Sequence, residues 1–230
     1  MQYADFEKIL SKARLNRFLK ACNGDKEKAL DLYRLNIKLS QNFFAILSMF
    51  EVALRNAIDS HYSGHFNDNE WLKNQCLGTG FLNNNAFQTG RFKSKKKVDA
   101  AIKELGVRYN HDRVIASLSF GFWVNLFAPI QFRLAGQNLH KIFPNRPKGK
   151  QPKQIFGELN FILDFRNRVA HHEPICFNGS ETVNLVGAEK CYDLLINYII
   201  WLNLDSSKFL KDLDNMSSII NEITTLNNSK

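Results

Sequence analysis

Arg166, His171 and His172 are the residues whose types and spacing best suit chemistry, within the sequence FRNRVAHHEP that runs from Phe165 to Pro174. Arginine keeps its charge and can bind two phosphate oxygens at once, whereas histidine titrates near neutral pH and can transfer a proton. A fixed cation beside a titratable base is suited to attacking a phosphodiester bond. The simpler alternative is a salt-bridged structural arginine with two surface histidines at a frayed helix end.

These residues close a predicted helix, because Pro174 cannot continue one and biases Glu173 away from helical dihedral angles. Arg166 falls on the apolar stripe of this helix, which is formed by Ile155, Leu159, Ile162 and Val169. A charge in that position needs an acidic partner, an anionic ligand or a route to water. Glu51 and Arg55, four residues apart on the apolar stripe of an earlier predicted helix, form either a pair within that helix or a site where Glu51 also holds Arg166.

The net charge of +9 is concentrated in two segments, residues 91–108 and 141–153, which each carry +5. Such charge suggests a polyanionic partner, and nucleic acid is the commonest one. The residues predicted to bind RNA are Lys95, Lys96, Lys97, Arg146, Lys148 and Lys150. The alternative is that both segments are only solvated surface.

Neither a metal site nor a cofactor is predicted. The cysteines stand far apart without metal-ligand spacing, and the chain lacks a Gly-rich phosphate loop of the Walker or Rossmann type. The N-terminus has no apolar signal core, and no run approaches about 20 apolar residues. We therefore expect a reduced, cytoplasmic protein that does not span a membrane.

The periodicity of the apolar residues predicts an all-α protein forming a single domain over residues 1–230. Residues 1–24, with a helix over 5–21, and residues 205–230, a helix and polar tail, are expected as appendages. The other expected helices cover residues 26–62 (split near Ser40), a short piece at 70–72, a stretch ending at Leu105, 111–127, 130–143, the helix that ends before Pro174, and 187–203. Residues 141–153 form a basic loop, and the segment from Pro174 to Val186 is extended, looped or a short hairpin.

Four segments in order resemble the Abi-like abortive-infection family, within the HEPN superfamily of all-helical proteins. They are ALDLY at residues 29–33 with Asn36 after it, FEVALRNA at 50–57, SFGFW at 119–123, and FRNRVAHHEPI at 165–175. The family's pattern is an arginine, usually followed by a polar residue, then a histidine after four to six intervening residues. Arg166, Asn167 and His171 satisfy this pattern with four residues between, and His172 satisfies it with five.

This resemblance implies a HEPN-like helical bundle and a metal-independent endoribonuclease, commonly a homodimer whose two motifs face each other. It also implies a role in phage defence or as a toxin, often held in check by an RNA or protein antitoxin. His171 would act as general base or acid, Arg166 would stabilise charge on the phosphorane, and Asn167 would orient the scissile phosphate.

A second class is a non-catalytic RNA-binding or protein-interaction HEPN module in phage defence. Loss of the arginine–histidine pair would be its expected sign, and Arg166 and His171 are both present.

Overall fold

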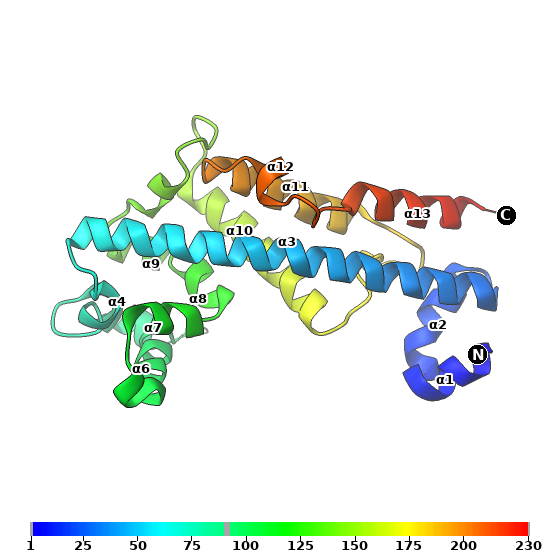
Figure 1. Cartoon of the computed structure of the whole chain (residues 1–230), viewed down its shortest axis with the longest axis horizontal. Coiled ribbons are helices and arrows are strands. Elements are labelled where there is room, and N and C mark those ends of the chain that lie inside the picture. The colour runs from blue at the N-terminus through cyan, green and yellow to red at the C-terminus, as the bar shows by residue number, and fades with distance from the viewer. Residues whose placement is uncertain (1, 90–92, 230) are drawn as a thin grey trace. The chain divides into compact units, whose positions relative to one another are not determined.

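The computed structural model describes residues 2–89 and 93–229, so Arg91 of the first basic segment lies outside the described residues. These residues form helices and irregular segments without a β-strand, which confirms the predicted all-α class (Figure 1). The α-helices are α1 (Tyr3–Leu10), α2 (Lys12–Ala21), α3 (Lys26–Phe66), α4 (Trp71–Asn74), α5 (Asn85–Gln88), α6 (Ser94–Leu105), α7 (His111–Ser117), α8 (Phe120–Asn125), α9 (Pro129–Leu134), α10 (Pro152–Ala170), α11 (Val186–Trp201), α12 (Ser206–Phe209) and α13 (Met216–Asn228). The 3₁₀ turns are η1 (Phe81–Asn83), η2 (Gly106–Arg108) and η3 (Leu139–Ile142).

The chain divides into two compact units, which are described separately. The first unit contains residues 1–48, 164–196 and 206–230, and the second contains residues 49–163 and 197–205. Helices α3, α10 and α11 therefore contribute residues to both units. The single domain expected over residues 1–230 stays a prediction.

Aromatic side chains form much of the core of each unit. In the first unit the ring of Phe18 meets the rings of Tyr33 and Phe177 edge-on at 5.2 and 5.3 Å, and the rings of Phe43 and Phe165 lie 4.7 Å apart. The last contact joins α3 to the helix that carries the predicted catalytic motif. Within the first unit, exposed side chains of α3 and α13 also form an ion pair.

The second unit is built around α4, the C-terminal half of α3 and the buried side chain of Tyr198. Tyr62 packs against Trp71 with 4.8 Å between ring centroids, and Tyr198 packs against Phe143 at 5.1 Å. The hydroxyl of Tyr198 donates to the Ile155 carbonyl at 3.3 Å, which connects α11 to the first turns of α10.

The predicted break near Ser40 is wrong, because α3 continues from Lys26 to Phe66. Ser40 Oγ donates to the Asn36 carbonyl at 3.0 Å, so this hydroxyl bonds within the helix rather than ending it. Leu39 and Phe43 beside it are fully buried, and tertiary packing therefore holds the helix through a residue of modest helix propensity.

Four other predicted helices are interrupted. The final helix predicted after Asp205 divides into α12 and α13, with residues 210–215 between them. The helix predicted over 5–21 breaks at Ser11, whose φ is +72° and whose side chain accepts from the Arg14 N–H as an N-cap. The helix predicted over 111–127 breaks at Leu118 and Ser119, which are extended. The helix predicted over 130–143 stops after Leu134, because Gly136 adopts a φ of +95° that ends the turn.

By length and composition α3 could cross a membrane. This is weak evidence, because the core helix of a soluble protein meets the same criterion, and Leu39, Phe43, Ile46 and Phe50 of α3 are fully buried. The cytoplasmic location stays a prediction.

Candidate active site at the end of α10

The end of α10 has a defined cap, with His172 in the left-handed conformation at a φ of +56°. The His172 N–H donates to the Val169 carbonyl at 3.0 Å, and the Glu173 N–H donates to the Arg168 carbonyl at 2.9 Å. These two bonds make a Schellman motif, in which a residue with positive φ allows the chain to turn off the helix. The frayed helix end of the simpler sequence interpretation is therefore wrong.

Arg166 and His171 keep the angular offset of an α-helix. The His171 N–H donates to the Asn167 carbonyl at 2.9 Å, so the helical hydrogen bonds continue through His171. Five residues at about 100° each place Arg166 and His171 about 140° apart around the axis. Arg166 and Asn167 are partly buried, whereas His171 and His172 are exposed.

Arg168 holds the segment that follows the helix. Its Nη2 donates to the carbonyls of Pro174 and Phe177, both at 3.0 Å, and its Nε lies 3.4 Å from a carboxylate oxygen of Glu173. Arg168 is not among the predicted site residues, although it lies inside the motif. Its guanidinium is occupied by the protein's own carbonyls, so its role is to position the chain after His171 and His172.

Asn36 of α3 anchors the same segment from a buried position. Its Oδ1 accepts from the backbone N–H groups of Ile175 at 2.8 Å and Cys176 at 3.1 Å, and the residue is 2% exposed. Because only the amide oxygen can accept, these two donors fix the orientation of the side chain. Asn36 lies in one of the segments that carry the family resemblance, but its role depends on a contact that the sequence does not reveal.

Basic residues of α2 also bind this segment. Arg14 Nη2 donates to the His172 carbonyl, Arg17 Nη2 donates to the Ser180 carbonyl at 2.7 Å, and the Arg17 guanidinium lies 4.5 Å from the centre of the Phe177 ring. Arg14 and Arg17 share one face of α2, since they are three residues apart. This three-residue spacing is the sequence feature from which a shared role of the two arginines could have been predicted. The segment from His171 onward is thus held by α2, α3 and α10 together, although it contains no regular secondary structure.

The predicted supporting residues Glu51 and Arg55 belong to the second unit, whereas Arg166 belongs to the first. Arg55 Nη1 donates to the Ala116 carbonyl at 3.4 Å, and its Nε is buried without a hydrogen-bond partner among the described residues. The pairing of Glu51 with Arg166 stays a prediction.

The predicted RNA-binding lysines of α6 differ in their surroundings. Lys95 Nζ lies 2.7 Å from Asp99 Oδ2, and this hydrogen-bonded ion pair raises the pKa of Lys95. Lys96 is exposed and Lys97 is partly buried. Lys96 is therefore the member of this group best placed to meet a polyanion.

The second group of predicted RNA-binding residues lies in the loop before α10, within the second unit. Lys150 Nζ pairs with Glu158 Oε1 at 2.5 Å, and Arg146 Nη1 donates to the Phe143 carbonyl at 3.1 Å. Lys148 is exposed. Arg146 and Lys150 thus help to hold the loop, which the sequence did not predict.

The cysteines are not candidates for a metal site or a nucleophile. All four are buried and unpaired, and burial raises the pKa of Cys76 and of Cys176 to about 12. Thiols with such pKa values stay protonated at neutral pH. Within residues 2–89 and 93–229 there is no group of three or more His, Cys, Asp or Glu residues that could hold a metal ion.

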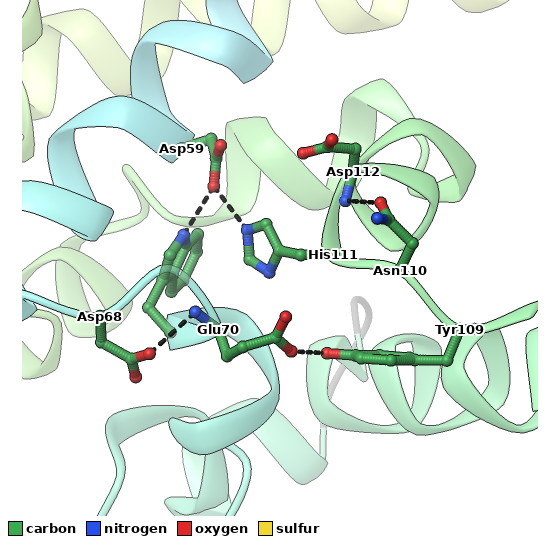
Figure 2. A network of polar contacts seen from close by, with 8 residues as sticks. Asp59, Asp68, Glu70, Tyr109, Asn110, His111 and Asp112 are labelled. Carbon is green, nitrogen blue, oxygen red and sulfur yellow. Dashed lines mark hydrogen bonds and ion pairs between the residues drawn. The ribbon is translucent and has the colours of Figure 1, made fainter.

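A polar network in the second unit, shown in Figure 2, was not predicted from the sequence. Asp59 Oδ1 is 2.8 Å from His111 Nε2 and accepts from the Trp71 indole N–H at 2.7 Å, while the Tyr109 hydroxyl donates to Glu70. Burial alone would raise the pKa of Asp59, but the hydrogen bonds from His111 and Trp71 outweigh it and lower the pKa. Burial lowers the pKa of His111, but Asp59 more than compensates, so the net shift is upward. Asp59, Trp71 and His111 thus form a partly buried structural cluster that joins α3, α4 and α7.

The fold and the capped motif helix together define an all-helical protein with a basic and titratable site at one helix end. A family model for Abi-like proteins matches residues 2–176, which is more than half of the chain, and the chain therefore belongs to the Abi-like protein family. No match was found among the curated proteins or the solved structures. The predicted family is confirmed, and membership suggests a role in abortive infection. The matched region ends at Cys176, directly after the motif and its first anchored residues.

Proposed function

We propose that this protein is a metal-independent endoribonuclease of the HEPN type, acting in phage defence by abortive infection or as the toxin of a toxin–antitoxin pair. The observation that carries this proposal is the combination of Arg166 and His171 at a capped and anchored helix end in an Abi-like chain. The substrate of the nuclease is RNA, and the inhibitor of the nuclease is an RNA or protein antitoxin.

The proposed reaction uses the ribose 2′-OH as the nucleophile. His171 removes the proton from the 2′-OH or donates one to the leaving oxygen. Arg166 stabilises the charge on the phosphorane through two parallel hydrogen bonds, which a lysine could not copy. Asn167 orients the scissile phosphate. The products carry 2′,3′-cyclic phosphate or 3′-phosphate ends.

We assign proton transfer to His171, which follows Arg166 with four residues between, and we take His172 as the control position because its backbone forms the helix cap. His172 occupies the left-handed position of the Schellman motif, and its carbonyl accepts from Arg14. Glycine adopts positive φ more readily than histidine, so His172→Gly preserves the cap. This variant is therefore a better control than His172→Ala.

A homodimer accounts for the offset of about 140° between Arg166 and His171. Each motif helix would contribute part of a shared site. Phe44 of α3 supports this arrangement, because it is 64% exposed in the unit that carries the motif, and an exposed phenylalanine is suited to an interface. Phe44→Asp is expected to yield monomers in light scattering and to reduce cleavage.

The experiment that tests the proposal is cleavage of mixed cellular RNA in EDTA. Wild type and His172→Gly are expected to cleave, while Arg166→Ala and His171→Ala lose activity and retain the far-UV circular dichroism of the wild type, and His171→Ala also retains its melting temperature. Activity that is abolished by EDTA and restored by magnesium would overturn the mechanism. Saturable RNA binding by the wild type without cleavage would favour the non-catalytic RNA-binding alternative.

A further inference from the structure

The loop between η3 and α10 surrounds a polar cavity of about 520 Å³ in the second unit. Residues between His140 and Pro152 line the cavity, and its basic members are His140, Arg146, Lys148 and Lys150. Among the described residues, no acidic residue lines it. All of its lining residues belong to the second unit, whereas Arg166 and His171 belong to the first.

This loop is ordered by its own hydrogen bonds. The Lys150 N–H donates to the Pro147 carbonyl at 3.1 Å across a turn in which Gly149 has a φ of +84°. Such a turn requires positive φ at its third residue, which glycine supplies without strain. Asn145 Nδ2 donates to Asn203 Oδ1 at 3.0 Å and ties the loop to the end of α11. The cavity is therefore preformed.

Three cations, Arg146, Lys148 and Lys150, belong to the lining of the cavity. Arg146 uses Nη1 for the His140 and Phe143 carbonyls, and no hydrogen bond from its Nε or Nη2 exists among the described residues. Lys150 is paired with Glu158, so Arg146, Lys148, Lys150 and this one carboxylate sum to a net charge of +2. A charge of +2 in a concave site matches a dianionic ligand.

His140 also lines the cavity. Its Nδ1 is buried and has no hydrogen-bond partner among the described residues, so this atom does not face the cavity and does not contact a ligand there. Burial lowers the pKa of His140, and the charges of Arg146 and Lys141 lower it further, as does His61. The contacts to an anion therefore come from the arginine and the lysines.

We propose that this cavity binds a dianionic phosphate group, as the phosphomonoester of a free nucleotide or of an RNA 5′ end. Arg146 supplies the paired donors that suit phosphate oxygens, and Lys148 supplies a mobile charge at the opening. The volume lies within the range of about 300–1,000 Å³ typical of small-molecule sites, so it accommodates a nucleoside as well as its phosphate. A phosphodiester backbone carries one charge per residue and follows an extended groove, whereas these cations surround one cavity.

The proposal concerns binding and does not depend on the nuclease activity, so it is tested in full-length His171→Ala protein. Titration calorimetry with 5′-AMP is expected to give saturable binding, and adenosine is expected to give none. Lys148→Glu should weaken 5′-AMP binding by about tenfold or more, because a charge-assisted contact becomes a repulsion. Lys103→Glu is the matched control, since Lys103 is an exposed lysine of the same unit, and it should leave the affinity unchanged.

Two further arms identify the source of the phosphate. The affinity for a short RNA with a 5′-phosphate is compared with the affinity for the same RNA with a 5′-hydroxyl. Both are measured for the His171→Ala protein and for the His171→Ala protein that also carries Arg146→Gln. Preference for the 5′-phosphorylated RNA over 5′-AMP assigns the site to RNA ends, and equal or tighter binding of 5′-AMP assigns it to nucleotides. Absence of 5′-AMP binding together with equal affinity for the two RNAs overturns the proposal. Equal weakening of 5′-AMP binding by Lys148→Glu and Lys103→Glu also overturns it, because general electrostatics would then explain the binding.

Discussion

Replacing Asn36 with leucine is expected to destabilise the first unit strongly. The substitution keeps a side chain of similar size but removes the oxygen that accepts from the N–H groups of Ile175 and Cys176. Those two residues are 1% and 0% exposed, so water cannot replace the lost acceptor without local opening. Each buried donor left unsatisfied costs about 1–3 kcal/mol, which gives a loss of about 2–6 kcal/mol in the free energy of unfolding.

Urea unfolding followed by circular dichroism measures this loss, with Asn42→Leu as the matched control on the same helix. Asn42 is also buried, but it donates a single bond to the Leu213 carbonyl, and its Oδ1 has no partner among the described residues. Its replacement is expected to cost no more than about 1.5 kcal/mol. Asn36→Leu should also lower the melting temperature by at least about 4 °C for a chain of this size. Equal losses in the two variants, or a loss below about 1 kcal/mol for Asn36→Leu, would refute the anchoring role.

The partly buried pair of His111 and Asp59 predicts a specific pH dependence. The pKa of His111 is raised above its ordinary 6.5, so its stabilising contribution is complete below that pH and is lost as pH rises through the folded-state value. The pKa of Asp59 is lowered, so its contribution is present above its ordinary 3.8 and is lost as pH falls through the folded-state value. The stability difference between wild type and His111→Gln should therefore be larger at pH 5.5 than at pH 8.5 in urea unfolding, and an equal difference at both would count against the pair. For RNA binding, Lys96→Ala is expected to reduce the slope of log affinity against log salt by about 0.7–0.9, and an unchanged slope would make α6 merely solvated surface. Finally, Glu51→Ala is expected to reduce stability less in an Arg166→Ala background than in wild type, whereas additivity within about 0.3–0.5 kcal/mol would show that the two are not in contact.

The longer helices were largely predictable, because their buried apolar residues recur at helical spacing that can be read from the sequence. The end of α10 was also predicted, since Pro174 sets it and the cap at His172 lies two residues earlier. Breaks and continuations were less predictable. Ser40 does not break α3 because burial of Leu39 and Phe43 outweighs local propensity, while Ser11 does break its helix because it can cap the next one.

In the candidate site, only the residues proposed to carry out the chemistry could be predicted from the sequence. The spacing of Arg166 and His171 is visible in the sequence, and so is the polar residue between them. Arg168 and Asn36 were not identified as anchors, because their partners are backbone groups whose proximity is created by the fold. Main-chain partners carry no residue-type signal, so spacing alone could not reveal them.

The most direct test of the nuclease mechanism compares two RNA oligonucleotides of the same sequence. One is all-ribose, and the other carries a single 2′-deoxy nucleotide at the position where the wild type cleaves. In EDTA, the wild type is expected to cut the all-ribose oligonucleotide and leave a 2′,3′-cyclic phosphate, because the adjacent 2′-OH is the nucleophile. The 2′-deoxy oligonucleotide should remain intact at that position, and His171→Ala should cut neither. Cleavage of the 2′-deoxy oligonucleotide at the same position by the wild type would contradict the mechanism, since the attacking oxygen would then come from water.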